Sequence, residues 1–259
     1  MSDDLVSFKM LVASEVGPEC DLLRECAAKA AFPVDYAAIG DPIDLAAIRA
    51  SVARDNLDFI FLDSCIPTAA RRAIYDAALV GKGQPLVVLI GPLGLASREV
   101  LQEDATADGM LGRPFGMSEA GAAIDGCARA RLPKQVLVVD GAATVRAVIR
   151  KVLQASRFRL KVAEAEDSKS AIEQAAKRHP DIVLLDCNMP GLDGFATLDL
   201  FKRTHQNAQV IMMAGTRDAR LDDRARASGA DDFLFKPFYA NDVDRILRRL
   251  LGLVAVKAS

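Results

Sequence analysis

Short runs of apolar residues alternate along this chain with longer segments in which apolar residues recur every three or four positions. In the C-terminal half, the apolar runs cover residues 135–140, 182–186, 209–214 and 232–236, and a more alternating strand is expected over 159–165. Such runs are typical of strands that are buried on both faces. The segments between them have the spacing of amphipathic helices, as in Val145, Val148 and Ile149.

The alternation of strands with helices predicts an α/β fold in which a parallel sheet is covered by helices on both faces and joined by right-handed crossovers. The N-terminal half has the same rhythm, with strands expected near residues 7–13, 34–39, 58–62, 86–90 and 109–112. Each half is therefore expected to form a five-stranded sheet of its own.

An internal repeat links the two halves. The matching segments are LDFIFLDSCIP and PDIVLLDCNMP, followed by GMLGRPF and DFLFKPF. Both pairs recur at the same offset, and Asp63 lies 123 residues before Asp186. The chain is thus predicted to contain two copies of one unit, residues 1–132 and 133–259, joined near the polar, Pro-containing segment 130–135.

Composition narrows the function classes. The chain has 259 residues and a formal net charge of −2, with no long single-sign charge run that would attract nucleic acid or an anionic membrane surface. The N-terminus lacks the pattern of a secretory signal, and no apolar run approaches the ~18 residues of a membrane span. Its five cysteines are scattered without CxxC spacing. We expect a cytoplasmic protein.

Candidate chemistry gathers at the ends of the predicted strands of the second half. Asp140, Asp186, Ala214 and Lys236 each follow or end a strand. In an open parallel sheet, ligands bind beyond the carboxyl ends of the strands, so these residues should meet at one edge. Two carboxylates and an ammonium group could there hold a divalent cation and an added anion.

Both halves resemble the receiver domain of two-component response regulators. The second half does so closely, through VLVVD, DIVLLDCNMPGLDG and FKPF, and the first half loosely. The resemblance implies two flavodoxin-like (βα)5 domains in tandem. It also implies that a histidine kinase or histidine phosphotransferase phosphorylates Asp186, and that Lys236 contacts the phosphoryl group. Asp140, Asp186 and the backbone carbonyl of Asn188 would bind Mg2+, Phe233 would be the aromatic switch, and Pro237 would follow a cis bond.

The second half departs from the family pattern at two positions. Gly141 stands where the family has a second acidic residue, so we expect weakened Mg2+ binding. Ala214 replaces the Ser or Thr whose hydroxyl normally follows the phosphoryl group. Thr216, two residues later, is a candidate substitute.

The first half has lost more of the pattern. We place Ala13 and Ser14 at the acidic pair, while Arg113 replaces the Lys. Ile90 and Met110 replace the hydroxyl residue and the aromatic switch. Only Asp63 remains of the phosphorylation set, and we predict that it forms a structural ion pair with Arg113. The first half is therefore interpreted as a pseudo-receiver.

Three functions remain open. The favoured one is a response regulator without an output domain, not an enzyme, which signals through a downstream protein that contacts residues 216–250, with a homodimer as a further option. The second is a phosphorylation-independent adaptor or scaffold, which Gly141 and Ala214 favour. The third is an enzyme on a flavodoxin-like fold; a phosphatase would need an acid two residues after Asp186, where Asn188 stands.

Overall fold

The computed structural model describes residues 6–40, 42–81, 83–92, 107–189, 194–215 and 219–253. The chain divides into two compact units. The first unit is Met1–Arg131 with Leu251–Ser259, and the second unit is Leu132–Leu250. Of the C-terminal residues that the sequence assigns to the second half, the described residues 251–253 therefore group with the first unit.

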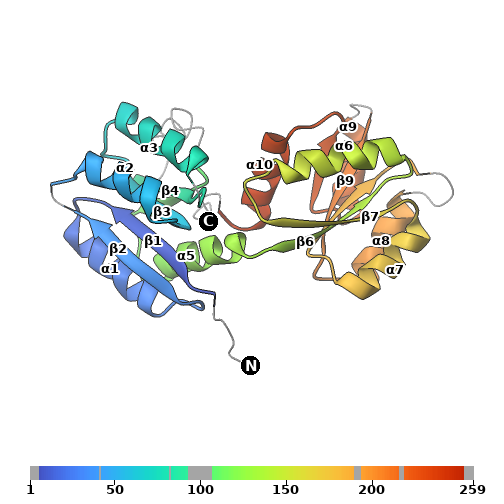
Figure 1. Ribbon diagram of the computed structural model, residues 1–259. Coiled ribbons are helices and arrows are strands. Elements are labelled where there is room, and N and C mark those ends of the chain that lie inside the picture. The colour runs from blue at the N-terminus through green and yellow to red at the C-terminus, as the bar shows by residue number, and fades with distance from the viewer. Residues whose placement is uncertain are drawn as a thin grey trace, which may run out of the picture. The chain divides into compact units, whose positions relative to one another are not determined.

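The first unit contains a five-stranded parallel sheet with the strand order β2-β1-β3-β4-β5 (Figure 1). Its described elements are β1 (Phe8–Ala13), α1 (Gly17–Ala28), β2 (Val34–Ile39), α2 (Leu45–Arg54), β3 (Phe59–Asp63), α3 (Thr68–Val80), β4 (Leu86–Pro92), β5 (Gly109–Arg113) and α5 (Met117–Arg131). Helices α1 and α5 pack together on one face of the sheet, and α2 and α3 on the other.

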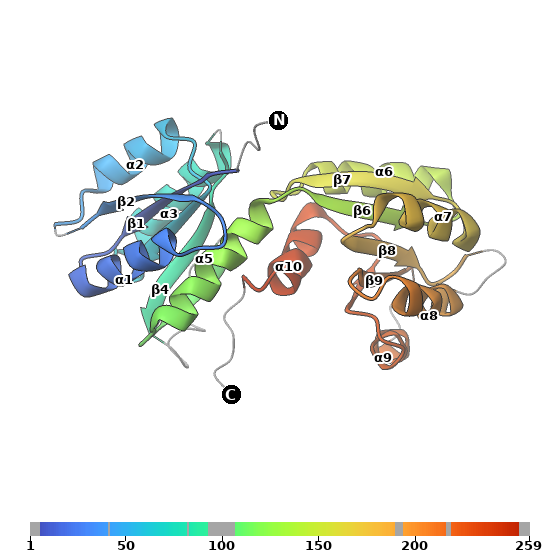
Figure 2. The same cartoon turned by 90° about the horizontal axis from the view of Figure 1, so that it is seen from below.

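The second unit repeats this architecture with the strand order β10-β9-β8-β6-β7 (Figure 2). Its elements are β6 (Lys134–Val139), α6 (Ala143–Gln154), β7 (Leu160–Ala165), α7 (Ser168–Arg178), β8 (Ile182–Asp186), α8 (Gly194–Thr204), β9 (Gln209–Ala214), α9 (Ala219–Ala227), β10 (Asp232–Phe235) and α10 (Ala240–Leu250). The predicted α/β fold with two parallel sheets is confirmed.

The central strand of each sheet is wholly buried, because helices cover both of its faces. All five residues of β3 and all five of β8 are buried. In the second unit, β8 packs against apolar residues of α7, α8 and α9, such as Ala171, Phe201 and Ala225. Each of these two strands ends in an aspartate, Asp63 or Asp186, at the carboxyl edge of its sheet.

The register of the strands aligns the two units residue by residue. Ala13 pairs with Leu62 in the first unit, and Val139 pairs with Leu185 in the second. The offset between the units is therefore 126 residues in the first strand, and it becomes 123 residues from α2 onward. The change falls in the connection from β2 to α2, which has five residues (40–44) in the first unit and two (166–167) in the second.

Candidate functional site

Three strand ends of the second unit bring together Asp140, Asp186 and Lys236. The Lys236 Nζ lies 2.5 Å from Asp140 Oδ2 and 3.0 Å from Asp186 Oδ1. Both aspartates are buried, with 2% and 8% of their surface exposed. One ammonium group thus pairs with two carboxylates at the mouth of the sheet and balances the charge of only one of them. The Lys236–Pro237 peptide bond is cis, as predicted.

The surroundings of Asp186 shift the pKa of its carboxyl in opposing directions. Burial raises the pKa of the Asp186 carboxyl above its usual value, and the nearby Asp140 carboxylate also raises it. The hydrogen bond and charge of Lys236, together with the backbone N–H of Asn188, favour the ionised form. Because the net shift is upward, the carboxylate is more basic than that of a solvated aspartate.

The oxygens at this edge suit a hard cation, although the set is small. Asp140 and Asp186 both point at one ammonium group, so their oxygens converge on one place. Gly141 supplies no carboxylate, and Asn188 is exposed. Among the described residues, no group of three His, Cys, Asp or Glu side chains could hold a metal ion. A cation here would need backbone and water oxygens as well, which Mg2+ accepts readily.

Two of the three predicted switch positions lie in the core of the second unit. Ala214 has no exposed surface and Phe233 only 8%, and both belong to the same apolar cluster. The Phe233 ring also contacts the ring of Phe235, with 4.9 Å between the centroids. Phe233 is therefore turned inward in this structure. Thr216 lies outside the described residues.

The strand register corrects the sequence alignment of the first unit. Ala13, which we placed at the first acidic position, is the last residue of β1 and is fully buried. Because Ala13 matches Val139, Ser14 matches Asp140 and Glu15 matches Gly141. The first unit therefore retains an acid, Glu15, at the position where the second unit has lost one.

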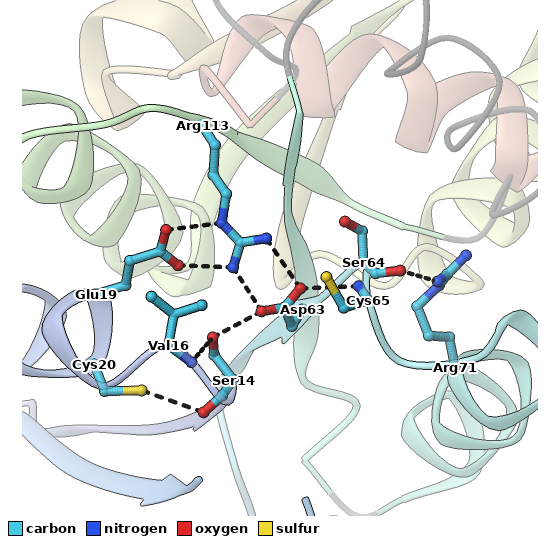
Figure 3. Close-up of polar contacts among 9 residues, drawn as sticks. All are labelled: Ser14, Val16, Glu19, Cys20, Asp63, Ser64, Cys65, Arg71 and Arg113. Carbon is cyan, nitrogen blue, oxygen red and sulfur yellow. Dashed lines mark hydrogen bonds and ion pairs between the residues drawn. The ribbon is translucent and has the colours of Figure 1, made fainter. Parts of the chain in front are cut away.

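The predicted ion pair of Asp63 and Arg113 is present, and it has a third member (Figure 3). Arg113 donates from Nη2 to Asp63 Oδ2 at 2.6 Å and from Nη1 to Asp63 Oδ1 at 3.1 Å. It also donates from Nε and Nη2 to the Glu19 carboxylate, at 2.8 and 2.7 Å. The guanidinium group thus bridges the end of β3 and the first turn of α1.

Two further donors complete the shell of Asp63. The Ser14 hydroxyl donates to Oδ2 at 2.8 Å, and the Cys65 backbone N–H donates to Oδ1 at 2.9 Å. Burial by itself would raise the pKa of Asp63, but the hydrogen bonds from Arg113, Cys65 and Ser14 outweigh it and lower the pKa to about 2. Asp63 is consequently a stable, weakly basic carboxylate.

This low pKa predicts that acid weakens the first unit. The pKa of Asp63 is lower in the folded chain than its usual 3.8. Its contribution, about 2 kcal/mol, is therefore complete above the usual pKa and is lost as the pH falls through about 2. Urea unfolding of wild type and Asp63→Asn at several pH values measures this, since the variant should lack this pH dependence. Asp21→Asn, at an exposed carboxylate of α1, should retain it.

Sequence reasoning missed Glu19 and also Arg71. Arg71 is 3% exposed, lies on α3, and donates to the backbone carbonyls of Ser64 and Ile66, both at 2.5 Å. It holds the loop that follows Asp63 (Figure 3). In the sequence, an arginine near the start of a helix resembles any solvated helix residue. The repeat could have revealed it, because the position that matches Arg71 in the second unit, 123 residues later, is Gly194, and an arginine there is therefore specific to the first unit.

Comparisons with known proteins match the second unit. Residues 136–248 match the family model of the response regulator receiver domain. The chemotaxis protein CheY of Bacillus subtilis is 35% identical over 118 residues, which are 46% of this chain and 98% of that protein. CheY of Listeria monocytogenes is 36% identical over 116 residues, covering 45% of this chain and 94% of that protein.

A solved structure covers both units. It belongs to a two-component system response regulator/GGDEF domain protein and covers 95% of this chain and 99% of that chain, with a TM-score of 0.53 and 20% sequence identity. At that identity the likeness supports the fold alone. None of the described helices is long and apolar enough to span a membrane.

Proposed function

The chain belongs to the response regulator receiver family, and we propose that it is a two-component response regulator phosphorylated on Asp186 by a histidine kinase or histidine phosphotransferase. One observation carries this proposal. The buried Asp186 shares the ammonium group of Lys236 with Asp140 at the open edge of the sheet. A nucleophilic carboxylate with a fixed positive charge beside it is the arrangement that phosphoryl transfer needs.

The transfer would proceed by direct attack. An oxygen of Asp186 forms the new O–P bond while the N–P bond of a phosphohistidine breaks, and the electron pair leaves with the imidazole. Asp186 must be ionised for this step, and the Lys236 ammonium at 3.0 Å favours that form. The chain would thus accept a phosphoryl group and not turn over a substrate.

We propose that Asp140, Asp186 and the backbone carbonyl of Asn188 hold Mg2+ in this step. The bound ion would neutralise charge on the phosphoryl oxygens. Because the site has only two carboxylates, its affinity should be limited by the missing acid at Gly141.

Restoring that acid should strengthen the cation site. In Gly141→Asp, we expect the Mg2+ concentration that gives half-maximal phosphorylation to fall by roughly tenfold, since the site gains one carboxylate. The measurement is the phosphorylation rate over a series of Mg2+ concentrations. Gly121→Asp adds the same charge on α5, at an open position, and should leave the Mg2+ requirement unchanged. An unchanged requirement in Gly141→Asp would contradict the proposed ligand set.

A hollow beside Lys236 supports a protein as phosphoryl donor. Its volume is about 390 Å3, and the residues that line it include Val145, Val148, Val152 and Phe238. Val148 is 60% exposed. An apolar surface next to the reactive group would let a donor protein bind close to Asp186.

The outgoing signal would pass through protein contacts. Within the proposed output segment 216–250, α9 exposes charged residues such as Asp223 and Arg226, which suits a partner chain or a second copy of this chain. The first unit would act as a pseudo-receiver. The alternative function is a phosphorylation-independent adaptor. It is favoured by Ala214, which has no hydroxyl to contact a phosphoryl group, and by Phe233, which is already buried in the apolar core without phosphorylation.

The deciding experiment measures the intact mass of the full chain after incubation with acetyl phosphate, with and without Mg2+. We expect a gain of one phosphoryl group that requires Mg2+, persists in Asp63→Asn and is absent in Asp186→Asn. If the folded wild-type chain gains no phosphoryl group under either condition, the phosphoacceptor function is excluded and the adaptor becomes the better reading.

A further inference from the structure

The phosphoacceptor position of the first unit is fully occupied by the protein's own donors. Each oxygen of Asp63 accepts two hydrogen bonds: Oδ1 from Arg113 and the Cys65 N–H, and Oδ2 from Arg113 and Ser14. Attack on phosphorus requires an oxygen lone pair that is free to form the new bond. The hydrogen bonds that lower the pKa of Asp63 also lower its nucleophilicity.

Glu19 fixes the guanidinium group in this place. Its carboxylate accepts a two-point contact from Nε and Nη2 of Arg113, while Nη1 and Nη2 face Asp63. Only the planar, forked guanidinium can make two such contacts at once; the ammonium group of a lysine cannot. Both Glu19 and Arg113 are largely shielded, each with 21% of its side chain exposed.

The second unit has neither of these two residues at the matched positions. Arg113 matches Lys236 at the offset of 123, and Glu19 matches Val145 at the offset of 126. Valine carries no charge, so this position of the helix cannot draw the cation away from the two aspartates. The two differences are therefore functionally linked: the first unit has both the arginine and the acid that holds it, and the second unit has neither.

We propose that Arg113 is a built-in cation that replaces the metal ion and the phosphoryl group in the first unit, with Glu19 as its positioning residue. The first unit is thus closed to divalent cations and phosphoryl donors because its site is already filled, although one of its two acidic positions still carries a carboxylate. Glu15 still stands at the second acidic position. This inference rests on the proposed function of Asp186, which serves as the reference for an open site.

The test gives the first unit the residues of the second. In a chain with Asp186→Asn, the substitutions Ser14→Asp, Glu19→Val and Arg113→Lys copy the second unit at matched positions. After acetyl phosphate and Mg2+, this variant should gain one phosphoryl group, which a further Asp63→Asn change removes. The parent chain with Asp186→Asn alone should gain none.

A control variant separates the site from general effects of substitution. Glu25→Val and Arg54→Lys, at exposed positions of the same unit, replace the two site changes while Ser14→Asp is kept. No phosphoryl gain is expected in this control. Uptake on Asp63 in the parent chain, or no uptake in the folded triple variant, would overturn the proposal.

A second measurement does not depend on the triple variant or on acetyl phosphate. Hydrogen exchange of the Cys65 amide, which donates to Asp63, should be unaffected by Mg2+ in wild type and become sensitive to Mg2+ in Glu19→Gln. Sensitivity in wild type, or none in the folded Glu19→Gln chain, contradicts the built-in cation. Phosphorylation of Asp186 is scored separately in Asp63→Asn, so a failure there refutes the proposed function without deciding this inference.

Discussion

Replacing Arg113 with methionine should destabilise the first unit by about 3 to 5 kcal/mol, because removal of one partner leaves buried charge without compensation. Asp63 is 1% exposed and would lose both contacts from the guanidinium group, while Glu19 would lose its two. Methionine fills a similar volume, so the expected loss is mainly electrostatic.

Urea unfolding of the full chain, followed by tyrosine fluorescence, measures this loss. The chain has three tyrosines and no tryptophan, and Tyr36 and Tyr75 lie in the first unit, so the signal reports largely on that unit. Arg54→Met removes an exposed arginine that pairs with Asp55 and should leave the stability nearly unchanged, since exposed ion pairs are screened by solvent. A similarly small effect of Arg113→Met would show that the ion cluster does not stabilise the fold.

Replacing Lys236 with methionine should slow phosphorylation of Asp186 by on the order of 100-fold, as expected when a group that stabilises developing charge is removed. The ammonium group is the shared partner of Asp140 and Asp186. Without it, burial and the Asp140 carboxylate would act unopposed by this charge and raise the pKa of Asp186 further. The ionised form of the acceptor, which is the one that attacks phosphorus, would then be less favoured.

The rate of mass gain with acetyl phosphate measures this effect. Lys202→Met is the matched control, because Lys202 pairs with Asp231 at the amino ends of the strands, opposite to the site, and its loss should leave the rate unchanged. If Lys236→Met reacts as fast as wild type in the folded protein, then Lys236 does not support the transfer. Loss of rate in both variants would point to a general loss of structure.

The sheet architecture of both units could be predicted from the sequence, since strands buried on both faces leave uninterrupted apolar runs. The positions of Asp63, Asp186 and Lys236 at strand ends could also be predicted, because the repeated segments place each of them directly after an apolar run. The acidic pair of the first unit was misplaced although the predicted strand end at Ala13 was right, because the matching strand of the second half was expected to end at Asp140 and in fact ends at Val139. Only the pairing of each first strand with the central strand shows that Ala13 matches Val139.

Glu19 could not be recognised for a related reason. Its partner, Arg113, is 94 residues away, and only the fold brings α1 to the end of β5. An acidic residue in the first turn of a helix is also common for local reasons, since it interacts favourably with the helix dipole. The informative comparison was with Val145, and it required the correct offset for the first strand.

The cluster of Glu19, Asp63 and Arg113 also bears on how this chain tolerates substitution. Conversion of the first site to the arrangement of the second needs several changes, and variants that alter one charged member alone lose charge compensation in a buried cluster. We therefore expect the three residues to be energetically coupled, so that changing two of them together costs less than the sum of the single changes. The ion cluster thus makes the first unit resistant to stepwise redesign as a phosphoacceptor.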